Sequence, residues 1–244
     1  MRVGIFIQAR SGSSRYPGKI FEGLPVEGAP SILEHIYRRL SKVRGYDVIS
    51  VLAPESDERL IQFCKKKKFS VFTGPEEDVR QRYRNAAEYY NTDLVIRATG
   101  DNPCVDPGIA EETLSMLKTK DRLDLFSFYN LPLGIAVEAF RKDALFADVS
   151  NDYPEYREHV SLHIKQNPGR FRILHADHPS MDFPCEALPR LTVDTAEDLQ
   201  VVRKLFSVLG KDFTTSQIMR LAEKNPEIFT GNLHVKQKTF AIHT

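Results

Sequence analysis

The alternation of short apolar runs with amphipathic segments constrains the fold of this chain more than any other feature. Four apolar, β-branched runs of strand length occur in the first hundred residues, and the segments between them repeat apolar residues every three or four positions, as one face of a helix does. Strands joined by helices form a parallel sheet, because a parallel crossover needs a long connection, and the helices then cover both faces. The predicted strands are VGIFI (3–7), DVISVLA (47–53), FSVFT (69–73) and DLVIRAT (93–99), and the predicted helices span 32–40, 55–65, 79–90 and 106–118.

The rhythm changes after residue 118, where the predicted elements become shorter and less regular. The fold class that follows is α/β, a three-layer α/β/α arrangement around a mostly parallel sheet. We expect one domain over 1–244, with a less regular portion at about 125–185 and a loosely held polar tail beyond 230. The later predictions are two strands within 123–140 broken by NLPLG, a helix over 154–166, a strand over 171–176, a short strand over 190–193, a helix begun by DTAEDL (194–199) and a helix over about 214–224.

The overall charge excludes a binding mode that rests on bulk electrostatics. Lys and Arg total 34 and Asp and Glu total 33, for a net charge of +1, so neither nucleic acid nor a membrane surface is a predicted partner. The three cysteines are widely spaced without a CxxC pair, which disfavours a disulfide framework and a zinc site. No run approaches the roughly 20 apolar residues of a membrane span, and a reduced cytoplasmic location is predicted.

The loop QARSGSSRYPGK (8–19) directly follows the first predicted strand and concentrates positive charge. Arg10, Arg15 and Lys19 occur among small residues with no carboxylate between them. The loop matches neither the GxGxxG nor the P-loop spacing. Ligands of open α/β sheets bind at the carboxyl ends of the strands, and Arg, Lys, serine hydroxyls and backbone N–H groups together suit a triphosphate. A solvated turn explains the same residue types equally well.

Two acidic residues follow other predicted strands. Asp101 comes at the end of the fourth strand, after Gly100, which permits close approach of a ligand to the backbone. Asp194 lies between a short predicted strand and a predicted helix. Either carboxylate alone is explained by a turn or a helix cap. Two carboxylates converging on a phosphate-binding loop, however, are typical of a Mg²⁺ site, because Mg²⁺ takes one or two protein carboxylates together with substrate phosphates.

Several separated motifs, in order along nearly the whole chain, resemble the sugar cytidylyltransferases. This superfamily includes the 3-deoxy-manno-octulosonate and acylneuraminate cytidylyltransferases, and the resemblance is closest to the branch called spore coat polysaccharide biosynthesis protein SpsF-like. It implies a nucleotide-diphospho-sugar transferase-like fold and Mg²⁺-dependent transfer of CMP from CTP to a small acidic sugar-type acceptor, with release of pyrophosphate. It also implies a homodimer and a role in surface polysaccharide or glycan precursor synthesis. The motifs are QARSGSSRYPGK, GPEEDVRQRY (74–83), RATGDNP, GIAVEAF (134–140), YREHVSLHI (156–164) and LTVDTAEDL.

The same resemblance implies a role for individual residues, carried over motif by motif. Arg15, Lys19 and Asp101 are the implied catalytic residues. Asp101 and Asp194 are the implied metal ligands. The implied acceptor-binding residues are Glu138, Arg157 and His159, and the implied nucleotide-binding residues are Ala9, Arg10, Ser13, Arg15, Lys19, Asp78, Arg82, Thr99, Gly100 and Asp101.

Two other functions remain open on the sequence. A glycosyltransferase that uses a preformed nucleotide sugar shares this fold class, but such enzymes usually carry Asp-x-Asp at the end of the central strand, and residue 103 here is Pro. A non-catalytic nucleotide-binding partner is the second alternative. Such a protein has no need of Lys19 or the two acids, and this chain keeps all three.

Overall fold

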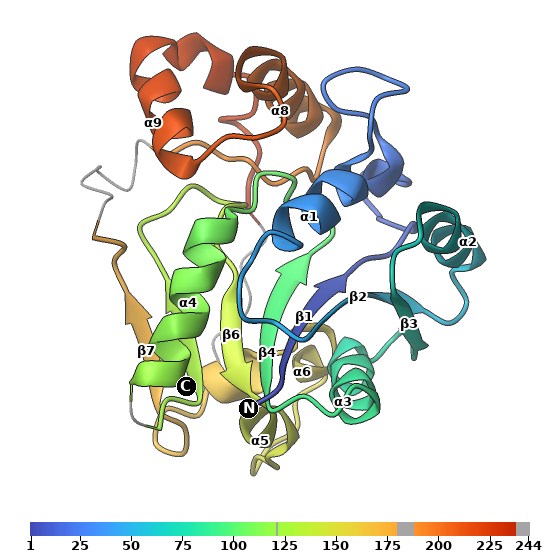
Figure 1. Ribbon diagram of the computed structural model, residues 1–244, viewed down its shortest axis with the longest axis vertical. Helices are drawn as coiled ribbons and strands as arrows, with labels where there is room; N and C mark the ends of the chain where they lie inside the picture. Colours follow the sequence, from blue (N-terminus) through green and yellow to red (C-terminus); the bar gives the residue numbers. More distant parts are fainter. Residues whose placement is uncertain (121, 180–187, 238–244) are drawn as a thin grey trace.

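A seven-stranded sheet with strand order β3-β2-β1-β4-β6-β5-β7 forms the centre of the molecule (Figure 1). The computed structural model describes residues 1–120, 122–179 and 188–237. All neighbouring strands are parallel except β6, which runs antiparallel to both of its neighbours. The strands are β1 (Val3–Gln8), β2 (Val48–Pro54), β3 (Val71–Gly74), β4 (Leu94–Thr99), β5 (Leu125–Phe128), β6 (Glu138–Arg141) and β7 (Ile173–Ala176).

Helices cover both faces of the sheet, which confirms the predicted three-layer α/β/α arrangement. Side chains alternate between the faces along each strand: Ile5 and Ile7 join one apolar core, and Phe6 joins the other. The first core packs under α1 (Ile32–Leu40), α2 (Glu58–Lys67), α4 (Pro107–Thr119), α8 (Ala196–Leu209) and α9 (Thr215–Lys224). The opposite side carries α3 (Val79–Tyr89), α5 (Lys142–Phe146), α6 (Glu155–Glu158) and α7 (Leu162–Lys165), with short 3-10 helices η1 (Lys19–Phe21) and η3 (Pro226–Phe229) elsewhere.

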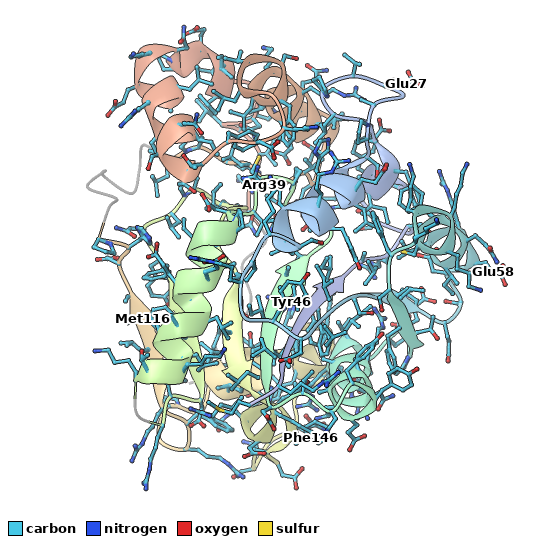
Figure 2. All side chains as sticks on the ribbon, viewed as in Figure 1. Glu27, Arg39, Tyr46, Glu58, Met116 and Phe146 are labelled. Carbon is cyan, nitrogen blue, oxygen red and sulfur yellow. The ribbon has the colours of Figure 1, made fainter. Side chains whose placement is uncertain are left out.

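Helices α8 and α9 lie together at one end of the molecule, and buried Arg39 joins them to the rest (Figures 1 and 2). Its guanidinium donates to the carbonyl oxygens of Val105, Lys211 and Phe213 at 2.7, 3.2 and 2.8 Å, and it stacks on the Phe213 ring. A charge buried in this way is tolerated because several of its donors are satisfied.

Two predictions for the second half of the chain are wrong. Residues 190–193 do not form a strand: an isolated bridge joins Arg190 to Leu133, and the Val193 N–H donates instead to the carbonyl oxygen of Asp101 at 2.8 Å. The predicted helix over 154–166 is two short helices, because His159 adopts an extended conformation between α6 and α7. The pair of strands predicted within 123–140 is confirmed as β5 and β6.

Asn232, in the tail that the sequence predicts to be loosely held, is fixed in place. Asn232 is 1% exposed, and its side-chain amide donates to the carbonyl oxygen of Arg190 and to the carboxylate of Asp198. Cys64 and Cys104 are buried and free, whereas Cys185 lies outside the described residues. Among the residues that the structure describes, no helix has both the length and the apolar character needed to cross a membrane.

Candidate active site

A cleft of about 630 Å³ opens at the carboxyl ends of β1 and β4. These two strands are neighbours in the sheet, but the connections that follow them lead in opposite directions, to β2 on one side and to the β5–β7 portion on the other. Such a switch point leaves a crevice in which α/β proteins bind their ligands. The loop after β1 and the loop after β4 form one end of the cleft, and β6 with the α6–α7 segment forms the other.

The loop after β1 is anchored at both ends. Ser11 donates its N–H and its hydroxyl to the carboxylate of Asp57, at 2.6 and 2.8 Å, and Asp57 also caps helix α2. The N–H of Gly18 donates back to the carbonyl oxygen of Ser11 at 2.8 Å, and its φ of 76° lies in the left-handed region that favours glycine. Within this closed loop the predicted phosphate-binding residues Arg10, Ser13, Arg15 and Lys19 all line the cleft.

Gly100 sets the distance between the two loops. Its N–H donates to the carbonyl oxygen of Gln8 at 2.8 Å, and a Cβ at this position would lie 2.8 Å from the Cβ of Ala9. Any side chain here would force the strand ends apart. The close approach directs Asp101 toward the loop after β1, and Ala9, Thr99 and Gly100 line the same part of the cleft.

The Lys19 ammonium bridges the two predicted metal-binding carboxylates. Its Nζ lies 3.0 Å from Oδ2 of Asp101 and 3.0 Å from Oδ1 of Asp194, and Lys19 is buried. Arg15 lies 2.9 Å from the same Oδ1. Burial by itself would raise the pKa of Asp194, but Lys19, Arg15 and Arg190 together lower it, so this carboxylate is ionised at neutral pH.

The chemistry of this donor set fits Mg²⁺ bound together with a phosphate ligand. Asp101 and Asp194 supply hard oxygen atoms on either side of one position, which the ammonium of Lys19 takes in the structure. In residues 1–120, 122–179 and 188–237 no three His, Cys, Asp or Glu side chains gather as a site made of protein ligands alone would require. The two carboxylates would therefore need substrate phosphates and water to complete the coordination of the ion.

Asp194 is not the helix cap that its position in the sequence allows. Thr195 caps α8, and Asp198 completes a capping box with it. Asp194 instead receives an ion pair from Arg190, whose Nη2 lies 2.7 Å from Oδ2. Arg190 was not predicted as a site residue, although it lies four positions before Asp194 and eight before Asp198, and this spacing was the available signal.

At the opposite end of the cleft, Glu138 binds three side chains. Oε2 accepts from Ser161 at 2.6 Å and from Arg97 at 3.3 Å, and Oε1 pairs with Lys165. Burial would raise the pKa of Glu138, but Lys165 and Arg97 outweigh this effect and lower the pKa to about 2. Sequence reasoning missed both cations, although a charged Arg97 inside the apolar run DLVIRAT is a signal of a site.

A side pocket of about 210 Å³ continues from this end of the cleft. Arg97, Glu138 and Lys165 line both spaces, and so does Asn102, whose buried Oδ1 has no hydrogen-bond partner among the residues that the structure describes. A buried acceptor without a partner is costly, and a ligand hydroxyl would satisfy it. The side pocket is also lined by Ser127 and by the half-exposed ring of Tyr129.

The remaining predicted site residues divide into two groups. Arg82 and His159 line the cleft, but Arg82 donates to the carbonyl oxygens of Pro75 and Glu76, and so fixes the loop after β3. Burial lowers the pKa of His159, so its neutral form predominates at neutral pH. Asp78 and Arg157 do not line the cleft: Asp78 caps α3, and Arg157 is exposed on α6.

The cleft, with its cationic loop and two carboxylates, lies at the switch point of an α/β/α sheet, and the similarity to known proteins identifies the chain as a nucleotidyltransferase of the nucleotide-diphospho-sugar transferase fold. A family model described as Cytidylyltransferase matches residues 4–235, and the chain belongs to this family. Spore coat polysaccharide biosynthesis protein SpsF of Bacillus subtilis is 34% identical over 232 residues, which cover 92% of this chain and 95% of that protein.

Solved structures agree with this assignment. A cytidylyltransferase from Leptospira borgpetersenii superimposes with a TM-score of 0.85 at 30% identity, over 99% of this chain and all of that one. A CMP:2-keto-3-deoxy-manno-octonic acid synthetase in complex with CTP superimposes with a TM-score of 0.65 at 20% identity, over 85% of this chain and 99% of that one. At that lower identity the likeness shows the fold alone.

Proposed function

We propose that this protein transfers CMP from CTP to a small acidic sugar, with Mg²⁺ and with release of pyrophosphate. The observation that carries the proposal is the bridge of Lys19 between Asp101 and Asp194, next to a loop that adds Arg10 and Arg15. Cations and carboxylates alternating over a few ångströms suit a metal-bound triphosphate, which needs both. Membership of the Cytidylyltransferase family supports CTP as the donor.

The residues of the loop after β1 would carry the transfer step. An acceptor oxygen attacks the α-phosphorus in line, and the bond to the pyrophosphate oxygen breaks on the opposite side. Arg15 and Lys19 would stabilise the charge that develops on the leaving pyrophosphate. No covalent intermediate on the protein is required, since positioning and electrostatics carry such reactions.

Asp101 and Asp194 would hold the metal ion, which when bound supplies positive charge to the phosphate oxygens. Their present partner is Lys19, so the ammonium has to exchange the carboxylates for phosphate oxygens as substrate binds. Asp101 is suited to this exchange: 28% of its side chain is exposed, and Lys19 is the partner that the structure gives its carboxylate.

The opposite end of the cleft supports an acidic, hydroxylated acceptor. Arg97 and Lys165 both pair with Glu138 and both line the cleft, so either cation can also donate to an acceptor carboxylate. Asn102 offers an acceptor hydroxyl its Oδ1, which no described residue contacts with a hydrogen bond. The neutral imidazole of His159 lies in the same wall and would accept the proton of the attacking hydroxyl.

The two other functions fit the site less well. A glycosyltransferase with Asp-x-Asp would place its second carboxylate at residue 103, whereas here Pro103 stands there and Asp194 supplies the second carboxylate from the start of α8. A purely binding protein has no use for the acceptor end around Glu138. The name of the Bacillus relative supports a role in surface polysaccharide or glycan precursor synthesis. Cytoplasmic location and homodimer formation stay predictions.

A nucleotide panel tests the proposal. Melting temperature is measured with CTP, UTP, ATP, GTP and CDP- or UDP-sugars, each with and without Mg²⁺. Ligand at 100 times its Kd stabilises a protein by about 2.7 kcal/mol. We expect selective stabilisation by CTP, with a Mg²⁺-dependent part that is lost in Asp101→Asn and kept in the exposed-acid control Glu88→Gln. Stabilisation by a diphospho-sugar without a response to CTP would favour the glycosyltransferase.

Pyrophosphate release tests the transfer itself. Protein, Mg²⁺ and CTP are incubated with a panel of 2-keto sugar acids and, as a matched control, with the corresponding neutral sugars. We expect release with at least one acid and none with the neutral sugars. Stable CTP binding without release for any acceptor would contradict a transferase and favour the binding protein.

A further inference from the structure

The carboxylate of Asp198 is fully buried behind the cleft and accepts more hydrogen bonds than a helix cap needs. A capping box accounts for the bond from the N–H of Thr195 at 3.1 Å. The same carboxylate also accepts from the N–H of Asp194 at 2.9 Å, from Nε of Arg190 at 2.9 Å and from Nδ2 of Asn232 at 2.7 Å. The bonds from Asp194 and Arg190 join Asp198 to the segment that carries Asp194, and the bond from Asn232 joins it to the C-terminal segment.

Arg190 connects this buried acid to the cleft. Its Nε binds Asp198, its Nη2 lies 2.7 Å from Oδ2 of Asp194, and its Nη1 donates to Oε1 of Gln237 at 2.5 Å. The planar guanidinium therefore fixes the relative orientation of two carboxylates. With Oδ2 and the backbone N–H of Asp194 both held from behind, Oδ1 is the oxygen that faces the cations of the cleft.

We propose that Arg190 and Asp198 are positioning residues that fix the carboxylate of Asp194 with Oδ1 toward the metal and phosphate position, and that Asn232 braces the pair from the C-terminal segment. This inference rests on the function proposed above. Neither residue touches the cleft cations, and both act through Asp194. Groups that orient a metal-binding carboxylate from behind typically contribute 10–100-fold to metal affinity.

Metal binding separates a positioning role from a merely structural one. Mn²⁺ binding to the full chain in the presence of CTP is measured by electron paramagnetic resonance, and CTP binding without metal is measured by calorimetry. We expect Arg190→Met to weaken Mn²⁺ binding about 10–100-fold and to change metal-free CTP affinity by less than about threefold. Arg190→Lys should recover only part of the loss, since one ammonium cannot hold both carboxylates in a fixed plane. Arg220→Met, an exposed arginine of α9, is the matched control.

A second variant keeps the test decisive if Arg190→Met does not fold. Asn232→Leu leaves Arg190 and Asp198 in place and removes the two hydrogen bonds that Asn232 donates to Arg190 and Asp198, and we expect Mn²⁺ binding to weaken about threefold or more. Unchanged Mn²⁺ binding with CTP in folded Arg190→Met, or in Asn232→Leu where the first variant is unfolded, would overturn the positioning role. Wild-type protein that binds no CTP would overturn the proposed function together with this inference.

Discussion

The two ends of the cleft each surround a carboxylate with cations, but they hold it differently. At the end next to β1, Asp101 gives one oxygen to Lys19 and remains 28% exposed. At the end next to β6, both oxygens of Glu138 are occupied, by Arg97, Ser161 and Lys165, and the pKa is lowered to about 2. The carboxylate of Asp101 can exchange Lys19 for another partner when a phosphate ligand binds, and we call this end of the cleft the exchangeable end. The carboxylate of Glu138 is held in place by its three partners, and we call that end the fixed end. Variants at the first end should change turnover, and variants at the second should change stability and acceptor affinity.

The largest effect is expected for Lys19→Ala. Removing a donor aimed at developing charge typically costs on the order of 10²–10³ in rate, and Lys19 is the cation shared by both carboxylates at the exchangeable end. Turnover is measured as pyrophosphate release and folding by the melting curve. Lys66→Ala, which removes an exposed cation of α2, is the control and should be neutral. Turnover above a tenth of the wild-type value would contradict a rate-determining role for Lys19.

The fixed end should show itself in the pH dependence of stability. The folded-state pKa of Glu138 is lowered from 4.5 to about 2, so its ionised form stabilises the fold above about pH 4.5, and this contribution is lost as the pH falls toward 2. The shift corresponds to about 3 kcal/mol of unfolding free energy at pH 7. Glu138→Gln should lose this amount at pH 7 and less than half of it at pH 3, in urea unfolding. A difference that stays constant with pH would contradict this electrostatic account.

Lys165→Met tests whether the fixed end binds the acceptor. Loss of one charge-assisted contact should raise the acceptor KM about tenfold and leave the CTP KM within about twofold. Arg157→Met is the informative comparison, because the family resemblance places Arg157 at the acceptor, whereas the structure leaves it exposed and outside the cleft. A raised acceptor KM in Arg157→Met, without one in Lys165→Met, would reverse the assignment of these two residues.

The difference between the two ends of the cleft also explains which parts of the molecule can be predicted from the sequence. The parallel half was predicted closely because its strands are continuous apolar runs. Lys19 and Asp101 could be expected to lie together because both follow strand ends, and the structure brings them within 3.0 Å of each other. Arg97 and Lys165 come from a strand interior and a short helix 68 positions apart, and only the antiparallel insertion of β6 brings Glu138 between them. No local pattern encodes such a pairing.

The errors in the second half have a similar cause. The run 190–193 has the composition of a strand, but its backbone donors are taken by Leu133 and Asp101, outside the sheet. Asn232 lies in a polar tail and is buried because its amide binds Asp198. The sequence pattern of the helix predicts that this acid is exposed, whereas it is fully buried. In both places the tertiary partner decides the local structure.

The smallest effect concerns Asp78, which the resemblance assigns to the nucleotide and which the structure makes the cap of α3 through the N–H of Gln81 at 2.7 Å. If capping is its function, Asp78→Ala should lower the unfolding free energy by about 1 kcal/mol, Asp78→Ser should restore most of that loss, and both variants should keep the CTP affinity of the wild type. Urea unfolding and CTP calorimetry on the same samples separate the two roles. Weaker CTP binding in both variants, at unchanged stability of Asp78→Ser, would return Asp78 to the nucleotide. It would also mean that the nucleotide reaches Asp78 from the part of the cleft that Glu76 and Val79 line.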